Sequence, residues 1–182
     1  RDRSVSRGLG DVYKRQDMDG TLAEWQEGTP LEEVCAPGYF AQLPPNENMA
    51  KAMIRFWEYS RKNNIEVFIL SAVFDDGHSI RDKNAWLDQY IPFIDAEHRI
   101  FVSCEEPKTA YINEHLGGMS ESDILIDDYS KNIKEWIAGG GKAIKMFNRV
   151  NGRSGAYFGP YTCSWLHPDM IVEDIKRYIH DA

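Results

Sequence analysis

The stretch Asp17-Met18-Asp19-Gly20-Thr21-Leu22 places two carboxylates on either side of one residue, directly before a glycine. On an extended strand tip, side chains two positions apart point to the same side. Asp17 and Asp19 would then lie close together, which requires a cation between them or a retained proton. The pair supplies a nucleophile and a general acid or base from one strand. Gly20 and Thr21 let the chain turn sharply, with backbone N–H groups exposed to phosphate oxygens. An ordinary Asp-Gly turn is the alternative.

Two polar residues further along the chain can also hold a phosphate group. Ser71 ends the apolar run Ile65–Leu70, and its hydroxyl can donate to a phosphate oxygen. Lys108 precedes a short expected helix and can bring a positive charge to the same place. Each has a plain alternative, because a serine at a strand end is commonly a cap and a single lysine is commonly a surface residue.

A pair of adjacent acids, Asp127 and Asp128, carries a more specific signal. The pair follows the apolar run Ile124–Ile126, and two acids that end a buried strand are costly without a cation to neutralise them. Carboxylate oxygens are ligands that suit magnesium. The sequence therefore predicts a Mg²⁺ site at this strand end.

Expected helices and strands alternate along the chain. We expect strands at 65–70, 100–102, 124–126 and 143–147, and helices at 47–62, 79–90, 109–116, 130–138 and 170–179. Residues 148–168 are expected to be irregular, and Ser130 is expected to cap the helix that follows it. This alternation predicts an α/β protein with a mostly parallel sheet, in which ligands bind beyond the carboxyl ends of the strands.

The residues before Asp17 do not fit this pattern. A central parallel strand is buried on both faces and should be apolar, whereas Lys14-Arg15-Gln16 is a run of polar residues. The ending DVYKRQ at 11–16 resembles translated sequencing-adapter sequence. We therefore expect residues 1–16 to be a foreign or disordered leader ahead of one domain at 17–182. A genuine polar arm is the alternative, and resequencing the gene distinguishes the two.

Composition excludes several classes of function. The formal net charge of −8, with no basic stripe, argues against nucleic-acid duplexes and anionic membranes as partners. The longest near-apolar run, Val67–Phe74, is far shorter than the roughly 20 residues of a membrane-spanning helix. Three scattered cysteines indicate a reduced, cytoplasmic compartment rather than a zinc site. The sequence leaves the oligomeric state open, with a homodimer as one candidate.

The order of these motifs, from DxDGT through Ser71 and Lys108 to Asp127-Asp128, resembles the haloacid-dehalogenase superfamily of phosphatases. The resemblance covers nearly all of the chain from Asp17 onward. It implies a Rossmann-like three-layer fold with a small cap at about 23–46. It also implies that Asp17 attacks phosphorus to form an aspartyl-phosphate.

The same resemblance implies roles for the other residues. Asp19 would protonate the leaving oxygen and then activate the hydrolytic water. Ser71 and Lys108 would hold the transferring group. Mg²⁺ would be bound by Asp17, the Asp19 carbonyl and Asp127, with support from Asp128.

Within the superfamily, the segments PGYFAQLPP (37–45), VFILSA (67–72) and ILIDDYSKN (124–132) look like the 5′(3′)-deoxyribonucleotidase branch. Members of that branch remove phosphate from nucleoside monophosphates. The resemblance implies that Lys83 lies near the phosphate, for which a solvated helix lysine is the alternative. It also implies that Trp25, Tyr39 and Phe40 stack on the base, for which packing inside the cap is the alternative.

We therefore expect an enzyme whose partner is a small phosphorylated substrate, most simply a nucleotide. The same chemistry could serve a sugar phosphate. A non-catalytic domain with this fold is a third alternative, but it would be expected to lack one of the chemical residues, and all of them are present.

Overall fold

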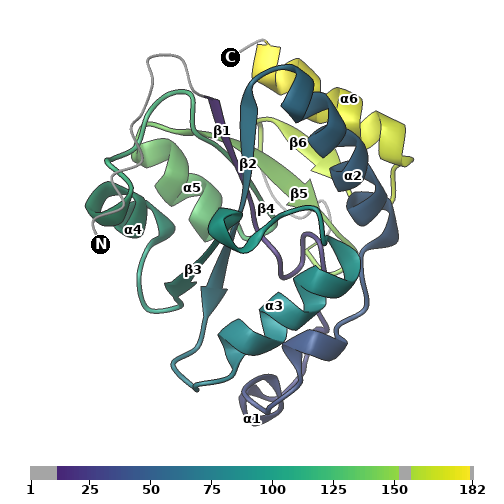
Figure 1. Cartoon of the computed structure of the whole chain (residues 1–182), viewed down its shortest axis with the longest axis vertical. Helices are drawn as coiled ribbons and strands as arrows, with labels where there is room; N and C mark the ends of the chain where they lie inside the picture. The colour runs from purple at the N-terminus through teal and green to yellow at the C-terminus, as the bar shows by residue number, and fades with distance from the viewer. Residues whose placement is uncertain (1–11, 152–156, 181–182) are drawn as a thin grey trace.

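Six parallel strands form the centre of the computed structural model, which describes residues 12–151 and 157–180. The strand order is β3-β2-β1-β4-β5-β6, with β1 between β2 and β4 (Figure 1). The strands are β1 (Val12–Gln16), β2 (Ile65–Val73), β3 (Arg99–Ser103), β4 (Ile124–Asp127), β5 (Lys142–Phe147) and β6 (Tyr161–Cys163). Because the chain runs outward from β1 first to one side and then to the other, the carboxyl end of β1 is the point at which ligands bind in such sheets.

Helices cover both faces of this sheet (Figure 1). On one face, α2 (Glu47–Lys62) packs beside α6 (Pro168–His180), and on the other α4 (Lys108–His115) packs beside α5 (Ser130–Ala138). Buried side chains alternate between the two layers along the strands, since Ile124 and Ile126 join the α2/α6 core while Leu125 joins the α4/α5 core. The α/β, Rossmann-like three-layer architecture expected from the sequence is confirmed.

A small cap leaves the domain after β1 and returns before α2. It contains α1 (Leu31–Val34) and the 3₁₀ turn η1 (Phe40–Gln42); a second such turn, η2 (Ala96–His98), precedes β3. Ala23 and Pro45 form an antiparallel bridge at the base of the cap, and Glu24 N donates to Pro44 O at 2.8 Å. The two ends of the cap are therefore side by side.

Helix α3 (Ser79–Tyr90) supports this cap. The Gly38 N–H donates to Asp82 Oδ2 at 2.5 Å, and Trp86 Nε1 donates to Leu43 O at 2.8 Å. Both partners on α3 are buried. The cap is thus fixed to the core by hydrogen bonds as well as by its base.

Strand β1 lies within the segment 1–16 that was expected to be a foreign or disordered leader. Residues 12–16 pair with β2 on one side and β4 on the other, so they are an ordered part of the domain rather than a disordered segment. Lys14, Arg15 and Gln16 are each 2% exposed, so polar side chains are buried in this strand. Backbone pairing on both sides determines the placement of the strand despite these side chains. Residues 1–11 lie outside the described residues, and a foreign origin for the segment stays a prediction.

The buried polar groups of β1 are unevenly compensated. Arg15 forms an ion pair with Asp123. Lys14 Nζ and Gln16 Nε2 have no hydrogen-bond partner among the described residues. Burial, together with the nearby Lys142 ammonium, lowers the pKa of Lys14 to about 7.

Three further expectations are revised. Ser71 lies inside β2 rather than after it, because the strand continues to Val73. The segment expected to be irregular contains β6, too short to produce a clear alternating pattern. Ser130 is the first residue of α5 instead of its cap, which is Tyr129.

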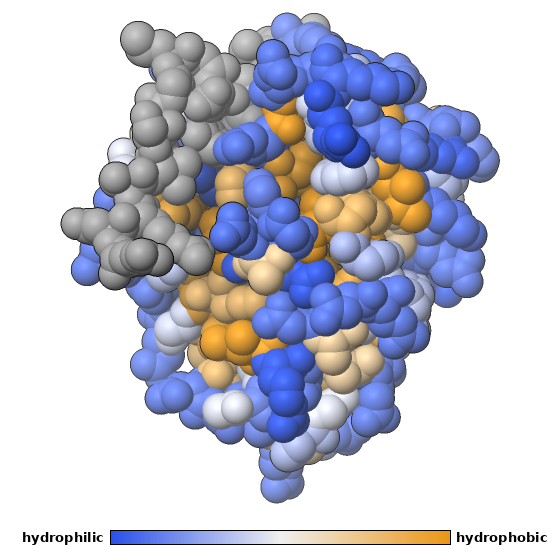
Figure 2. Space-filling view, viewed as in Figure 1, coloured by the Kyte–Doolittle hydropathy of each residue, from blue (hydrophilic) through white to orange (hydrophobic). Residues whose placement is uncertain are grey.

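The outer surface is mainly polar. Figure 2 shows hydrophilic residues over most of one face, with hydrophobic residues in interrupted patches between them. Within the described residues, every helix is too short or too polar to cross a bilayer.

Candidate active site

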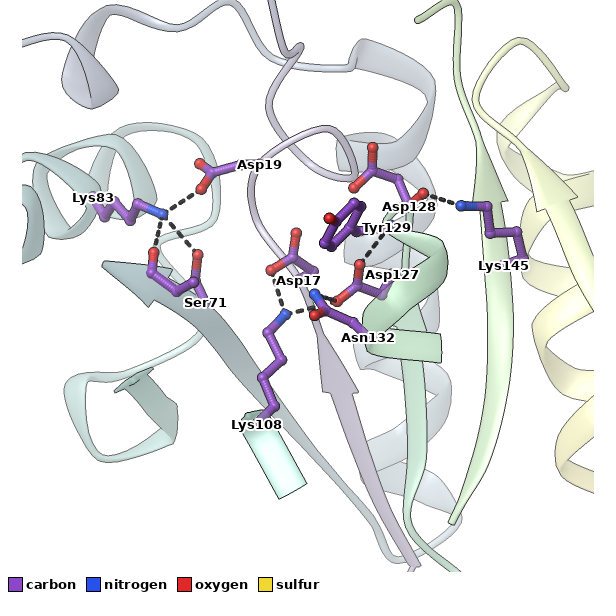
Figure 3. A network of polar contacts seen from close by, with 11 residues as sticks. Asp17, Asp19, Ser71, Lys83, Lys108, Asp127, Asp128, Tyr129, Asn132 and Lys145 are labelled. Carbon is purple, nitrogen blue, oxygen red and sulfur yellow. Dashed lines mark hydrogen bonds and ion pairs between the residues drawn. The ribbon is translucent and has the colours of Figure 1, made fainter. Parts of the chain in front are cut away.

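Asp17 follows β1 directly and contacts a buried lysine. Its backbone N–H donates to Ile126 O at 2.9 Å, which holds it beside β4. Lys108, the first residue of α4, places Nζ 2.6 Å from Asp17 Oδ1 and 2.7 Å from Asp127 Oδ2 (Figure 3). Burial alone would lower the pKa of Lys108, but the Asp127 and Asp17 carboxylates raise it above its ordinary value. The ammonium is therefore a permanent positive charge between the two acids.

Carboxylates surround this lysine. Oxygen atoms of Asp17, Asp127 and Asp128 lie within 4.8 Å of one another. Burial, together with Asp127, Asp19 and Asp128, raises the pKa of Asp17 well above its ordinary value, although Lys108 opposes this. Burial and Asp127 also raise the pKa of Asp128 to about 7. A divalent cation would relieve this repulsion, and an all-oxygen donor set fits Mg²⁺.

The second carboxylate of the motif lies on the other side of Asp17 (Figure 3). Asp19 forms an ion pair with Lys83 of α3. Lys83 Nζ also donates to Ser71 Oγ at 2.9 Å and to Ala72 O at 2.6 Å. Because Lys83 is completely buried, the alternative of a solvated helix lysine is wrong. The structure thus groups Asp19, Ser71 and Lys83 at the carboxyl ends of β1 and β2.

The turn after Asp19 requires a glycine for a steric reason, and its Thr21 amide is not exposed as expected. Gly20 has φ +73°, and a Cβ there would overlap the Asp128 carboxylate, so only glycine fits. Thr21 N donates to Met18 O at 3.3 Å, so the expectation of an exposed Thr21 amide is wrong. The Thr21 hydroxyl is buried, without a hydrogen-bond partner in the described part of the chain.

Comparison with known proteins identifies a family for this chain. Residues 21–172 match the profile of a family described as 5′ nucleotidase, deoxy (Pyrimidine), cytosolic type C protein. The chain belongs to this type C 5′-nucleotidase family. The match includes Ser71, Lys83, Lys108 and the Asp127-Asp128 pair.

Two curated relatives of this chain come from strains RP62A and ATCC 12228 of Staphylococcus epidermidis. Each carries the name "Putative 5'(3')-deoxyribonucleotidase" and is 27% identical over 108 residues, 59% of this chain and 51% of the relative. The match thus spans about half the length of these relatives.

A solved structure shares the fold of this chain. It is the D,D-heptose 1,7-bisphosphate phosphatase from Burkholderia thailandensis, with a TM-score of 0.58 and 9% identity over 92% of this chain and 99% of that one. At this identity the likeness concerns the fold. The family and the superfamily fold implied by the motifs are thereby confirmed.

Residues that the motifs did not indicate hold these acids in place. Asn132 Nδ2 donates to Asp127 Oδ2 at 2.9 Å, and Tyr129 N donates to Asp127 Oδ1 at 2.7 Å. Lys145 donates to the Asp128 carbonyl and, at 3.0 Å, to Ser130 Oγ. The sequence could have indicated Lys145, because a lysine inside the apolar strand 143–147 needs a buried partner.

Asn148 is another residue that the motifs missed. Its Nδ2 donates to Gly20 O at 2.7 Å and to Asp128 Oδ2 at 2.8 Å, so it ties the glycine turn to the acid pair. Asn148 directly follows β5, as Asp17 directly follows β1. A polar residue at the carboxyl end of an apolar strand is the signal that indicated Asp127, and it would also have indicated Asn148.

The three cap aromatics differ in position. Trp25 is half-buried and lines a cavity of about 540 Å³ beside the site. Phe40 is 1% exposed and stacks on Phe74 with ring centroids 6.2 Å apart, as packing inside the cap would have it, and the base-stacking role of Phe40 stays a prediction. Tyr39 is half-buried and meets the Trp25 ring edge-on, without lining that cavity.

Proposed function

We propose that the protein is a Mg²⁺-dependent phosphomonoesterase that removes phosphate from deoxynucleoside and nucleoside monophosphates through an aspartyl-phosphate on Asp17. The observation that carries the proposal is the contact of Lys108 with both Asp17 and Asp127 at the end of the central strand. This arrangement places a nucleophile, a fixed cation and a group of oxygen donors around one point. Family membership supports the substrate class.

The first half of the reaction follows from the two sides of the site. An Asp17 carboxylate oxygen attacks phosphorus, and the bond from phosphorus to the nucleoside oxygen breaks. Asp19 gives its proton to that leaving oxygen. Ser71 donates a hydrogen bond to the transferring group, and the ammonium groups of Lys83 and Lys108 offset its charge.

The second half regenerates the enzyme. Asp19 accepts a proton from water, whose oxygen attacks phosphorus and releases Asp17 and inorganic phosphate. Asp17, Asp127 and Asp128 would hold Mg²⁺ through their carboxylates and Asp19 through its carbonyl. When bound, the ion supplies positive charge to the phosphate oxygens and separates the clustered carboxylates.

A cytoplasmic location is part of the same proposal. The family description is that of a cytosolic type. Cys35, Cys104 and Cys163 are all unpaired, as expected in a reducing compartment.

The experiment that tests the function is a panel of phosphomonoesters assayed side by side with Mg²⁺. The panel contains deoxynucleoside monophosphates, nucleoside monophosphates and sugar phosphates. We expect the highest kcat/KM for a nucleoside monophosphate. A clear preference for sugar phosphates would replace the nucleotide assignment with the sugar-phosphate alternative, and the absence of turnover on every compound would favour a non-catalytic domain.

A further inference from the structure

All of the hydrogen-bonding capacity of the Asn148 side chain is in use. Nδ2 donates to Gly20 O at 2.7 Å and to Asp128 Oδ2 at 2.8 Å. Oδ1 accepts from the backbone N–H of Val150 at 3.0 Å and from that of Asn151 at 2.8 Å. A carboxamide has two donor hydrogens and one oxygen with two lone pairs, so this side chain, which is 7% exposed, is fully paired. A rotated amide would set its oxygen against two oxygen acceptors, and the network therefore determines the direction in which Nδ2 points.

A second asparagine of the same loop fixes this orientation. The backbone N–H of Asn148 donates to Asn151 Oδ1 at 3.0 Å, so each of the two side chains accepts from the backbone of the other. Asn151 Nδ2 donates to Met146 O and to Asp128 O, both at 3.0 Å. The two amides thus join the loop after β5 to the backbone of Asp128, and Asn148 has little freedom to turn away from its acceptors.

The two acceptors of Asn148 Nδ2 belong to two sides of the proposed metal site. Gly20 directly follows Asp19, whose carbonyl is one of the expected Mg²⁺ ligands. A carboxylate oxygen of Asp128 lies within 4.8 Å of one of Asp17. One amide group therefore bonds to both the turn after Asp19 and the Asp128 carboxylate, and it determines how far apart they stand.

Asn148 holds this carboxylate without neutralising it. The Lys145 ammonium donates to the backbone carbonyl of Asp128 (Figure 3). The carboxylate oxygen Oδ2 accepts instead from the neutral amides of Asn148 and, at 3.4 Å, Asn151. A cationic donor at this oxygen would offset the negative charge that attracts a metal ion, whereas an amide orients the oxygen and leaves its charge available.

We propose that Asn148 is a positioning residue that sets the affinity of the site for Mg²⁺, by holding the Asp128 carboxylate and the Gly20 turn at a fixed separation. The proposal rests on the proposed Mg²⁺-dependent function. It concerns a residue that is not itself a ligand, because an amide nitrogen that donates both of its hydrogens offers no lone pair to a cation. It gives the loop after β5 a part in metal binding.

Asn148→Ala tests the proposal in a calorimetric titration of the substrate-free protein with Mg²⁺. We expect the dissociation constant of Mg²⁺ to rise about 10- to 100-fold, because the loss of a hydrogen-bond partner of a metal ligand weakens metal binding by that amount. The Mg²⁺ concentration for half-maximal hydrolysis of p-nitrophenyl phosphate should rise by a similar factor. At saturating Mg²⁺, kcat should change less than about 3-fold, since the reacting groups are intact. A purely structural role would lower the melting temperature and leave the dissociation constant unchanged.

Asn113→Ala is the matched control, because Asn113, at an exposed position of α4, also fixes a loop by accepting from Met119 N at 2.9 Å. This variant should change neither the dissociation constant of Mg²⁺ nor kcat. Asn151→Ala, at a half-buried position, provides a second variant in case Asn148→Ala folds poorly. It should also raise the dissociation constant, because Asn151 holds both Asn148 and Asp128.

An unchanged dissociation constant in Asn148→Ala, or in Asn151→Ala where the first variant does not fold, would overturn the proposal while Mg²⁺ binding by the wild type stands. A wild type that binds no Mg²⁺, or that hydrolyses p-nitrophenyl phosphate equally well in chelator, would instead refute the proposed function, and the proposal with it.

Discussion

Lys108 Nζ lies 2.6 Å from Asp17 Oδ1, so the proposed nucleophile makes a direct contact with a buried ammonium. Three other acids raise the pKa of Asp17, and Lys108 is the cation that opposes them. Lys108 therefore favours the ionised form of Asp17 against burial and the other acids, and in the proposed mechanism it also meets the phosphate.

Asp17→Asn removes the nucleophile with almost no change in shape. A carboxamide does not attack phosphorus, so we expect turnover to fall by about 10⁴-fold or more. The fold should be retained, since the substitution removes a charge from a repulsive cluster. Steady-state kinetics and circular dichroism check the two statements, and substantial residual activity would refute the assignment of Asp17.

Lys108→Met should reduce both activity and stability. We expect kcat to fall by about 10²- to 10³-fold because a fixed positive charge on the phosphate is lost. Loss of a buried ion-pair partner should cost about 3–5 kcal/mol in unfolding free energy. Urea unfolding measures the second effect. Arg177→Met, which breaks an exposed ion pair with Asp174, is the control and should change neither quantity appreciably.

Mg²⁺ should stabilise the folded protein without any substrate. At a concentration about 100 times its dissociation constant, a ligand specific for the folded state adds about 2.7 kcal/mol. We expect a rise in melting temperature with Mg²⁺ that chelator reverses, together with loss of activity in the chelator. Asp127→Asn should weaken the shift strongly. An equal shift in this variant would argue against the proposed ligand.

Gly20→Ala should be much more harmful than Gly28→Ala. Both glycines have positive φ, +73° and +83°, so both variants carry the same backbone strain of about 1–2 kcal/mol. Only at Gly20 would the new methyl group overlap the Asp128 carboxylate. The unfolding free energies of Gly20→Ala and Gly28→Ala should differ by the cost of that overlap, and only Gly20→Ala should lose activity. Equal effects would show that Asp128 can move aside freely.

Lys14 should make stability depend on pH above neutrality. Its pKa is about 7 in the folded chain, against an ordinary value of 10.5, so between these values the unfolded chain binds a proton that the folded chain does not. Unfolding free energy should therefore rise as the pH increases from 7 to 10.5, and the penalty should be complete below pH 7.

Lys14→Met removes the contribution of Lys14 to this dependence and should stabilise the protein at pH 7 by about 1–3 kcal/mol. Lys134→Met, at an exposed helix position, is the control and should leave the pH profile unchanged. Because burial also lowers the pKa of Lys145, part of the rise should remain, and a Lys14→Met profile as steep as that of the wild type would contradict the explanation.

The sequence places the candidate catalytic residues at one edge of the sheet for a topological reason. Asp17 follows β1, and Ser71 and Asp127 belong to strands that run in the same direction, so all three lie where the carboxyl ends of the strands meet at one edge. Strand-end polarity is visible without a structure. The burial of Lys83 is not visible in the sequence, because its charged neighbours Arg81 and Asp82 make that part of α3 look solvated.

The rest of the site depends on packing between distant segments. Trp165 follows a strand of three residues, and nothing local links it to Trp25 across the cavity. In strand β1 the side-chain pattern misleads, because three polar residues in a row hide a central strand. Its place between β2 and β4 comes from backbone pairing, which any residue except proline can make.

The closed base of the cap makes residues 24–44 an exchangeable module. Since the bridge between Ala23 and Pro45 brings both junctions together, a cap of another length can be grafted there without lengthening the path from Asp17 to α2. Such a chimera would replace Trp25 and keep Trp165, so the two halves of one cavity are free to diverge at separate rates. A grafted cap would have to restore the hydrogen bonds that Gly38 and Leu43 make with α3, because these bonds fix the present cap to the core.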